Sequence, residues 1–249
     1  MFYGQYTGFG AGSSGYSADA AHFDGTNDSM RISSDLTGAA NTKTHLISGW
    51  FNFAAGDGDG LALFQNSSGA GGDLILQRHT SDTHRIINHD TTVTNFEFFS
   101  TTTTTAAVAT GWHHIMSSWD GTNFHFYQDD VEVKNATVER DVVGIGTGTA
   151  WYFGISHVTT QRWDGDAFDF YYDQSYLDLS VEANRRLLID ANGKPVEWAS
   201  ILTNVGTPLV GFHLDRGEAA DNFADNADGS GGAFTVTGAL TTASTRPTD

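Results

Sequence analysis

The sequence of 249 residues contains no cysteine and only three prolines. The absence of cysteine excludes disulfide bonds and thiolate chemistry, and it leaves the redox compartment of the protein undetermined. Because proline is scarce, most turns must rely on the 29 glycines and on asparagine and aspartate, which is typical of proteins rich in β-hairpins.

Basic residues are also scarce, since 12 lysines and arginines face 30 acidic residues and leave a formal net charge of −18. Of the acidic residues, 24 are aspartates and 6 are glutamates. Aspartate favours turns and glutamate favours helix interiors, so this balance argues against a helical protein. A surface of this charge repels phosphate backbones, so nucleic acid is not an expected partner, whereas Ca²⁺ is compatible with it.

Long apolar segments are missing as well. No run approaches the roughly 18 residues that a membrane-spanning helix requires, so membrane insertion is not expected. The first residues, "MFYGQYTGFGAGSSG", have neither the basic nor the apolar region of a signal peptide. A protein without a signal peptide can still act outside a cell after lysis, as virus particles do.

What the sequence has instead is a succession of short segments rich in β-branched and aromatic residues, each bounded by glycine, asparagine or aspartate. They begin near residue 20 and include "THLISGWFNF", "DLILQR", "HRIINH", "HHIMSSW", "NFHFYQ" and "AFDFYY". Regular short strands with such punctuation predict an all-β sandwich or barrel.

Two of these segments alternate in a way that predicts which side chains share a face. In 123–128 the two phenylalanines lie on one face, and the histidine and tyrosine lie on the other. In 167–172 we expect Phe168 and Phe170 on one face and Asp169 on the opposite one. Half-buried antiparallel strands have this pattern.

One segment, 178–195, has the pattern of a helix. Ser180 is the predicted N-cap and Glu182 lies in the first turn, where the helix dipole favours a negative charge. Asn192-Gly193 supplies the C-terminal stop.

An aromatic residue precedes Asp-Gly three times, in "FDGTN", "WDGTN" and "WDGDA". Asp-Gly forms tight turns with positive φ, and the preceding ring anchors the end of a strand by packing. We therefore expect Asp24, Asp120 and Asp164 to accept hydrogen bonds from their own turns rather than to bind a ligand.

The order of the motifs resembles that of the laminin-G-like, or concanavalin A-like, jelly rolls. The resemblance covers about residues 20–190 and rests on "AAHFDGTNDSMRI", "HLISGWFNF", "GWHHIMSSWDGTNFHFYQDDVEV" and 151–188. It implies an all-β jelly-roll sandwich of two antiparallel sheets with one short helix. Where the family has Asp-Gly after its aromatic strand, this chain has Asp129-Asp130, and aspartate tolerates positive φ better than most residues.

Residues 1–19 consist mainly of glycine, serine and aromatic residues without periodicity, and we expect them to form an N-terminal arm or linker. The resemblance implies that residues 20–195 form the jelly roll. Residues 196–249 are expected to form a C-terminal extension that completes the sandwich and ends in a loose tail.

The C-terminal part, from "NRRLLIDANGKPVEW" to "NADGSGGAFTVTGALTTAS", resembles segments of laminin-G-like structural proteins encoded by tailed phages. This resemblance implies a non-enzymatic virion protein on the head or tail surface that displays a lectin-like domain, with other virion proteins and host glycans as partners. An exposed edge strand or the aromatic arm would favour homo-oligomers. A stand-alone carbohydrate-binding module is the alternative.

An enzyme is a further alternative, because jelly rolls of this superfamily include glucanases. Those enzymes carry two glutamates close together on one strand, in roughly the pattern Glu-x-Asp-x-x-Glu. None of the six glutamates reproduces it, and Glu132 and Glu139 are seven residues apart, on opposite faces of a continuous strand. A glycan hydrolase would have to use aspartate pairs, and we expect no enzyme.

For a metal, the candidates are Asp57, Asp59 and Asp73, whose Asp-Gly loops could offer oxygens to Ca²⁺ at a sheet rim. A solvated turn is the preferred interpretation, so no cofactor beyond this Ca²⁺ is expected. A zinc site is not expected, because three histidines spaced five residues apart alternate between the faces of a strand: His79, His84 and His89.

For a glycan, aromatic faces supply the usual contacts. The candidates are Tyr152, Trp163, Tyr171, Tyr172 and Trp198. Each of them alone is better explained as a core residue, because large aromatic side chains are mostly buried.

Overall fold

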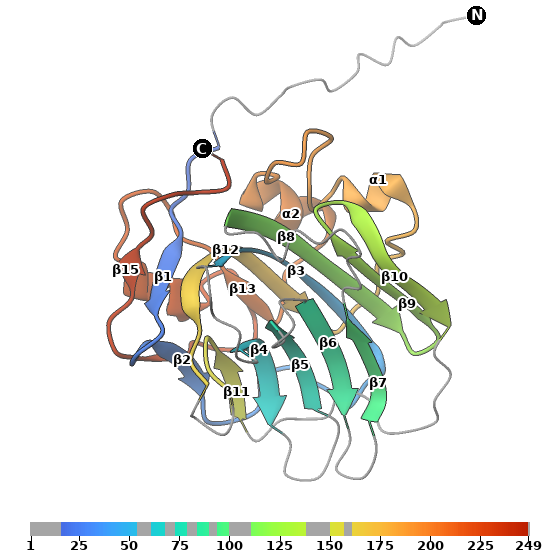
Figure 1. Ribbon diagram of the computed structural model, residues 1–249, viewed down its shortest axis with the longest axis horizontal. Coiled ribbons are helices and arrows are strands. Elements are labelled where there is room, and N and C mark those ends of the chain that lie inside the picture. The colour runs from blue at the N-terminus through green and yellow to red at the C-terminus, as the bar shows by residue number, and fades with distance from the viewer. Residues whose placement is uncertain are drawn as a thin grey trace, which may run out of the picture.

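The computed structural model describes residues 16–53, 61–67, 73–78, 84–89, 94–99, 111–137, 150–156 and 161–248. Within them the chain forms two antiparallel sheets, which confirms the predicted all-β sandwich (Figure 1). No helix among the described residues is long and apolar enough to cross a membrane.

The larger sheet has eight strands in the order β10-β9-β8-β3-β12-β1-β15, and β13 also pairs with β12. Its strands are β1 (Ala21–Asp24), β3 (Thr44–Phe53), β8 (Gly111–Asp120), β9 (Asn123–Gln128), β10 (Val131–Thr137), β12 (Asp164–Asp173), β13 (Val210–Phe212) and β15 (Thr241–Thr242). The smaller sheet has seven strands in the order β14-β2-β11-β4-β5-β6-β7. Its strands are β2 (Ser29–Ile32), β4 (Leu61–Ser67), β5 (Asp73–Arg78), β6 (His84–His89), β7 (Thr94–Phe99), β11 (Ala150–Phe153) and β14 (Thr235–Thr237).

An aromatic core joins the two sheets. The ring of Phe170 in the larger sheet lies 4.8 Å from Phe64 and 5.1 Å from Phe153 of the smaller sheet, measured between centroids. Phe51 lies 5.8 Å from Trp163, and all five side chains are fully buried. Each such burial contributes on the order of 1.5–3 kcal/mol to folding, so this cluster holds the sandwich together.

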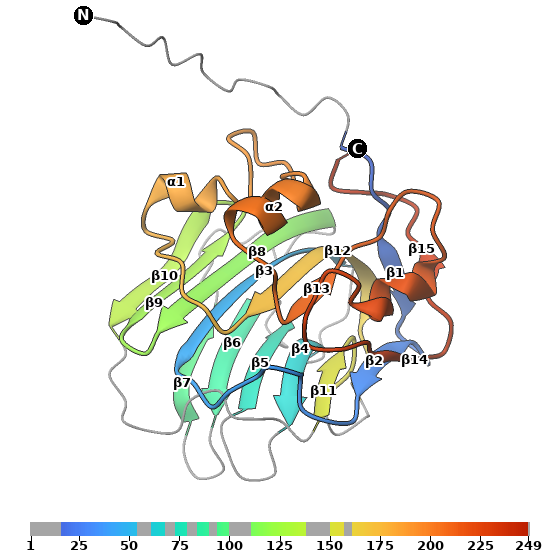
Figure 2. The same cartoon turned by 180° about the vertical axis from the view of Figure 1, so that it is seen from behind.

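A third layer covers the outer face of the eight-stranded sheet, on the side away from the smaller sheet. It contains α1 (Glu182–Arg185), which lies above β10 in both views, and α2 (Trp198–Asn204), which lies above β8 (Figures 1 and 2). A short 3₁₀ helix, η1 (Ala220–Asp225), packs near β1 and β13. The layer and the sheet share a second buried cluster, whose members include Leu46, Trp50, Met116, Phe168, Tyr171, Leu188, Trp198 and Ile201.

The strand β12 contains a bulge that overturns one prediction. Phe168 and Phe170 do not share a face, because Phe168 packs in the outer cluster and Phe170 packs in the sandwich core. The register to β3 shifts between Phe168 and Tyr171, and the intervening Asp169 has φ +46°. One extra residue in a strand reverses the alternation beyond it. The alternation predicted for 123–128 is confirmed, because its phenylalanines pack in the sandwich core and its tyrosine packs in the outer cluster.

The turn between β9 and β10 uses two aspartates with positive φ. Asp129 has φ +51° and Asp130 has φ +62°, as a two-residue type I′ hairpin requires, so the expected tolerance is confirmed. Asp130 also binds Arg185 and Arg186 of the α1 region, each at 2.6 Å. Burial raises the pKa of Asp130, but its hydrogen bonds and ion pairs with these arginines outweigh burial and lower it. An aspartate therefore replaces glycine here and fastens α1 to the hairpin.

The predicted helix over 178–195 is wrong in length. Only the four residues of α1 are helical, and Ser180 is not the N-cap, because its amide and hydroxyl both donate to Asp178. Short polar side chains compete with the helix for backbone groups in this way. Glu182 does lie in the first turn, and α2 was not predicted.

The C-terminal segment expected to be a loose tail is packed. Thr241–Thr242 pairs with β1 as strand β15, and Arg246 donates to Asp19 at 2.8 Å. Lys194 Nζ donates to the carbonyl of Pro247 at 3.1 Å. The last described residues therefore lie beside the point where the described chain begins (Figure 1). Local sequence patterns do not predict contacts between residues this far apart in the chain.

Three buried histidines predict how stability depends on pH. Burial lowers the pKa of His45 to about 3, and burial is also the main cause that lowers the pKa of His84 and of His114 to about 4. In the unfolded chain these imidazoles take up protons near pH 6.5. Between pH 6.5 and pH 4 the unfolded state therefore binds more protons than the folded state. As the pH is lowered through this range, we expect the free energy of unfolding to decrease by about 1.4 kcal/mol per pH unit for each histidine.

Urea unfolding across this pH range measures the effect. The variant His114→Gln removes one proton-binding site, so its unfolding free energy should fall less steeply below pH 6.5. An unchanged slope in that variant would contradict the assignment.

Candidate functional site

Two of the three aromatic-Asp-Gly motifs are turns, as predicted. Asp24 accepts from the amides of the three residues Thr26, Asn27 and Asp28 at 2.8–3.1 Å, and these bonds, above all that from Asn27, hold its pKa below the usual range. Asp120 accepts from the two backbone amides that follow Gly121 and from one side-chain amide. Both motifs are therefore structural.

The third motif is not a turn, so the prediction for Asp164 is wrong. Asp164 opens β12 and lies opposite Asp24 of β1. Its side chain is exposed and has no hydrogen bond to another described residue. The next residue, Gly165, lies inside the strand opposite Phe53 of β3. An added Cβ at Gly165 would lie 2.7 Å from the ring of Trp163, so glycine serves here for close packing.

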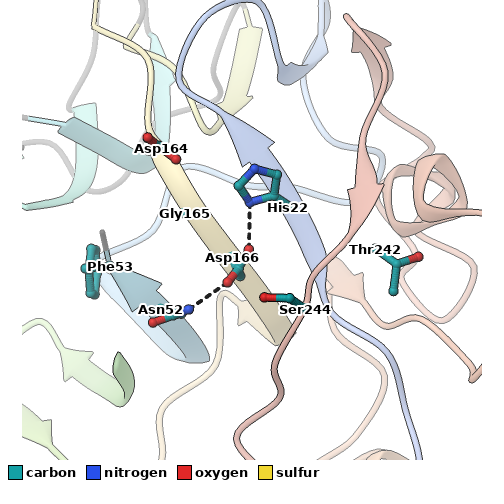
Figure 3. A pocket seen from close by; sticks show the side chains of 8 residues that line it. All are labelled: His22, Asn52, Phe53, Asp164, Gly165, Asp166, Thr242 and Ser244. Carbon is teal, nitrogen blue, oxygen red and sulfur yellow. Dashed lines mark hydrogen bonds and ion pairs between the residues drawn. The ribbon is translucent and has the colours of Figure 1, made fainter. Parts of the chain in front are cut away.

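A cavity of about 280 Å³ opens at this end of β12, on the outer face of the sheet (Figure 3). This volume is near the lower end of the range for small-molecule sites. Four strands and the chain after β15 supply the lining residues, which are His22, Asn52, Phe53, Asp164, Gly165, Asp166, Thr242 and Ser244. The tail that was expected to be loose thus forms one wall.

Asp166 is the central side chain of the cavity. One carboxylate oxygen lies 2.7 Å from Nδ1 of His22, and the other accepts from the amide of Asn52 at 2.7 Å, as Figure 3 shows. Asp166 is only 6% exposed, so its position is fixed. A carboxylate has about four acceptor positions, and these two bonds leave the others available to a ligand.

Further polar groups surround this carboxylate. Because Nδ1 of His22 donates to Asp166, Nε2 of the same ring remains for a ligand, and the His22 side chain is 37% exposed. The hydroxyl of Ser244, which points toward Asp166 in Figure 3, adds a group that can both donate and accept. The cavity therefore suits a ligand rich in hydroxyl groups.

Strand register places an aromatic ring in line with these groups. Trp112, Asn52, Asp166 and His22 are successive cross-strand partners on β8, β3, β12 and β1. Cross-strand partners share a face, with Cβ atoms about 4.5–5.5 Å apart, so the indole lies beside the polar group. The protein has six tryptophans, all in the described part of the chain, and Trp112 is the one that is not buried. Its Nε1 donates to Thr245 at 3.2 Å, next to the cavity wall.

The profile of a known family matches residues 13–175, which include all four strands of this row. Its description is concanavalin A-like lectin/glucanases superfamily. The chain belongs to this superfamily. No curated protein matches the sequence.

Solved structures show the same superfamily fold. A candidate carbohydrate-binding protein from Bacteroides ovatus matches with a TM-score of 0.61 and 13% identity, over 92% of this chain and 61% of that one. A heptameric SAP-like pentraxin from Limulus polyphemus matches with a TM-score of 0.50 and 12% identity, over 66% of this chain and 80% of the pentraxin. Domains LG4-5 of the mouse laminin α1 chain match with a TM-score of 0.50 and 14% identity, over 66% and 43%. At such identities the likeness shows the fold alone.

The aromatic residues predicted as sugar contacts lie in the interior. Tyr152, Trp163, Tyr171, Tyr172 and Trp198 are all at most 6% exposed. They are not brought together, because they divide among the sandwich core, the outer cluster and a small cluster of their own. No ring face of the five is available to a sugar, and their burial explains why the chain has them. Sequence reasoning missed Trp112 because only the register shows that it lies beside polar partners.

The predicted metal ligands fall largely outside the described residues. Asp57 and Asp59 lie outside them, as does His79, and Asp73 is placed only as the first residue of β5. Within the part of the chain that the structure describes, no group of three or more histidine, cysteine, aspartate or glutamate side chains is arranged to hold a metal ion.

A second polar cluster lies under α2 and is structural. Asp169, at the bulge, accepts from the hydroxyl of Tyr16 and pairs with Nδ1 of His213 at 2.7 Å. Nε2 of His213 pairs with Asp215 at 3.2 Å, and Trp198 stacks on the ring at 5.5 Å. Burial lowers the pKa of His213, but the two carboxylates outweigh burial and raise it. With both nitrogens occupied, this histidine cannot serve as a general base.

The close packing at Gly165 gives a test of the site's framework. An alanine there would meet the backbone carbonyl of Asn52 and the ring of Trp163. We expect Gly165→Ala to lower the free energy of unfolding by about 1–3 kcal/mol, as measured by urea unfolding. Wild-type stability in Gly165→Ala would contradict the packing argument.

Proposed function

We propose that this protein binds glycans through the cavity around Asp166 and that it does so without catalysis. The observation that carries the proposal is a buried carboxylate that His22 and Asn52 hold at 2.7 Å and that lines a solvent-connected cavity. Sugar hydroxyls are the donors that such a group accepts. Burying a polar group without full pairing is costly, and a ligand that completes the pairing explains its retention.

Two further facts support a sugar. Trp112 lies beside the polar row, and an aromatic face next to hydrogen-bonding groups matches the mixed apolar and polar faces of a sugar ring. The fold is that of lectins, and the Bacteroides ovatus protein that shares it over 92% of this chain carries a carbohydrate-binding description. The second fact is an analogy of fold, and the first comes from the site.

A glycan hydrolase is the competing function, because Asp164 and Asp166 lie two positions apart on one strand and project from the same face. In glycoside hydrolases the two carboxyl groups flank the scissile bond. Here both come from one wall, and the buried Asp166 is engaged on both oxygens by protein donors. This arrangement favours binding over catalysis.

We also propose that the protein is a component of a phage particle, exposed on the head or tail surface. Support comes from the resemblance of the C-terminal part to structural proteins of tailed phages. That part is built into the sandwich, since β13, β14 and β15 pair with β12, β2 and β1. Other virion proteins and copies of the same chain are the proposed partners, and host glycans the proposed ligands.

Glycan binding is tested with the full chain displayed on beads against a glycan array, with and without Ca²⁺. We expect bound glycans, and we expect Asp166→Asn to weaken their binding at least tenfold, about 1.4 kcal/mol, because one charge-assisted acceptor is lost.

The matched control is Asp225→Asn, an exposed aspartate at the end of η1 that loses the same charge. Its binding should equal that of the wild type. Incubation with β-glucans should release no reducing ends. Absence of binding to every glycan would remove the proposal, and release of reducing ends that Asp166→Asn abolishes would establish the hydrolase instead.

The virion role is tested by mass spectrometry of purified particles from the virus that encodes the chain. We expect peptides of this protein in a fixed ratio to the major capsid or tail proteins. Particles of full infectivity that lack the chain would refute the role, whatever the result of the glycan array.

A further inference from the structure

We propose that the cavity selects its glycan by charge, accepting uncharged or ammonium-bearing sugars and rejecting those that carry carboxylate, sulfate or sialic acid. This inference rests on the proposed glycan binding and adds the class of ligand. It follows from which charged groups line the cavity and which do not.

Negative groups dominate the lining. Asp164 and Asp166 both line the cavity, and Asp24 lies directly opposite Asp164 across the β1–β12 pair. Asp164 is exposed and has no hydrogen-bond donor among the described residues, so none of these residues neutralises its charge. A ligand anion would enter a site that already holds two carboxylates.

Positive groups are absent from the lining that the structure describes, apart from the imidazole of His22, which is bonded to Asp166. The arginine nearest in sequence, Arg162, is engaged elsewhere. Its guanidinium donates to the carbonyl of Asn27 at 2.9 Å and to the hydroxyl of Ser29 at 3.2 Å. Recognition of carboxylate or sulfate normally uses an arginine or lysine, and neither residue type is among the described residues that line this cavity.

Asp164 and Asp166 have different roles in the proposed selection. Asp166 is held by two donors and 6% exposed, so it provides fixed hydrogen-bond acceptors for hydroxyl or ammonium groups. Asp164 is exposed and has no hydrogen bond that fixes its side chain among the described residues, so it contributes mainly its charge. Removing that charge alone should relax selection while the acceptors of Asp166 remain. The ring of Trp112 is uncharged, and its contribution should be the same for every class of sugar.

The experiment uses three oligosaccharides that share a β-1,4-linked glucose backbone and differ in charge: cello-oligosaccharides, chitosan oligomers and glucuronate oligomers made by oxidising cellulose. Each is titrated against the full chain on beads at low and at physiological salt, beside an array that includes sialylated and sulfated glycans. The wild type, Asp164→Asn, Trp112→Ala and the control Asp225→Asn are compared.

We expect the glucuronate oligomer to bind at least tenfold more weakly than its neutral counterpart. The gap should narrow at higher salt, since screening weakens interactions between exposed charges. Asp164→Asn should reduce the difference in affinity between the glucuronate and the neutral oligomer, and Asp225→Asn should leave this difference unchanged. Trp112→Ala should weaken the binding of every bound class by the same factor. A stronger affinity for the chitosan oligomer than for the neutral one would identify an amino sugar as the preferred ligand, and equal affinity would show that the cavity accepts both classes alike.

Anionic glycans that bind as tightly as neutral ones would overturn the charge selection and leave the glycan-binding function intact. A gap that Asp164→Asn does not change would also overturn it, by showing that the charge of the cavity mouth is not its cause. Failure of every glycan class on beads and array would overturn the charge selection together with the proposed function.

Discussion

The eight-stranded sheet is covered on both faces, by the second sheet on one side and by α1, α2 and their connecting segments on the other. A strand exposed on one face can direct its polar residues into water, but a strand covered twice cannot, so each polar side chain needs a partner within the protein. His45 meets Ser117 in the sandwich core at 3.0 Å, and His114 meets Ser48 in the outer layer at 2.9 Å. These pairs fix the register of β3 against β8, because a slip of one residue would bury each imidazole without its hydroxyl.

The same constraint explains where the site lies. Over the second half of β12 the outer layer buries Phe168 and Tyr171 beneath α2, and the polar Asp169 there is paired with His213. The bulge at Asp169 separates that half from the first residues of the strand, where the cover is only the chain after β15. Polar groups can remain there, and each is oriented by its neighbour across the sheet. The site thus lies on the outer face of the eight-stranded sheet, where only the chain after β15 covers the strands.

Sequence patterns predicted those features that depend on neighbouring residues. The positions of the strands follow from β-branched and aromatic segments between turn residues, and the positive φ of Asp129 follows from its place in a hairpin. Features that depend on distant contacts were not predictable. The bulge at Asp169, the packed tail and the half-buried position of Trp112 each involve a partner more than forty residues away in the chain. The three aromatic-Asp-Gly motifs show the limit, since identical local chemistry gives turns at Asp24 and Asp120 and a strand at Asp164.

The way in which strand register fixes the site affects how it binds a ligand. His22, Asn52 and Asp166 are fixed by strand register, and their hydrogen bonds join three strands. A ligand that binds such a site does not have to order the groups that contact it, so less of its interaction energy is offset by lost conformational freedom. The specificity of a rigid site then depends on what it repels as much as on what it attracts. In a chain with a formal charge of −18, the proposed repulsion of anions would arise from Asp164 and Asp166, two carboxylates placed by the same strand.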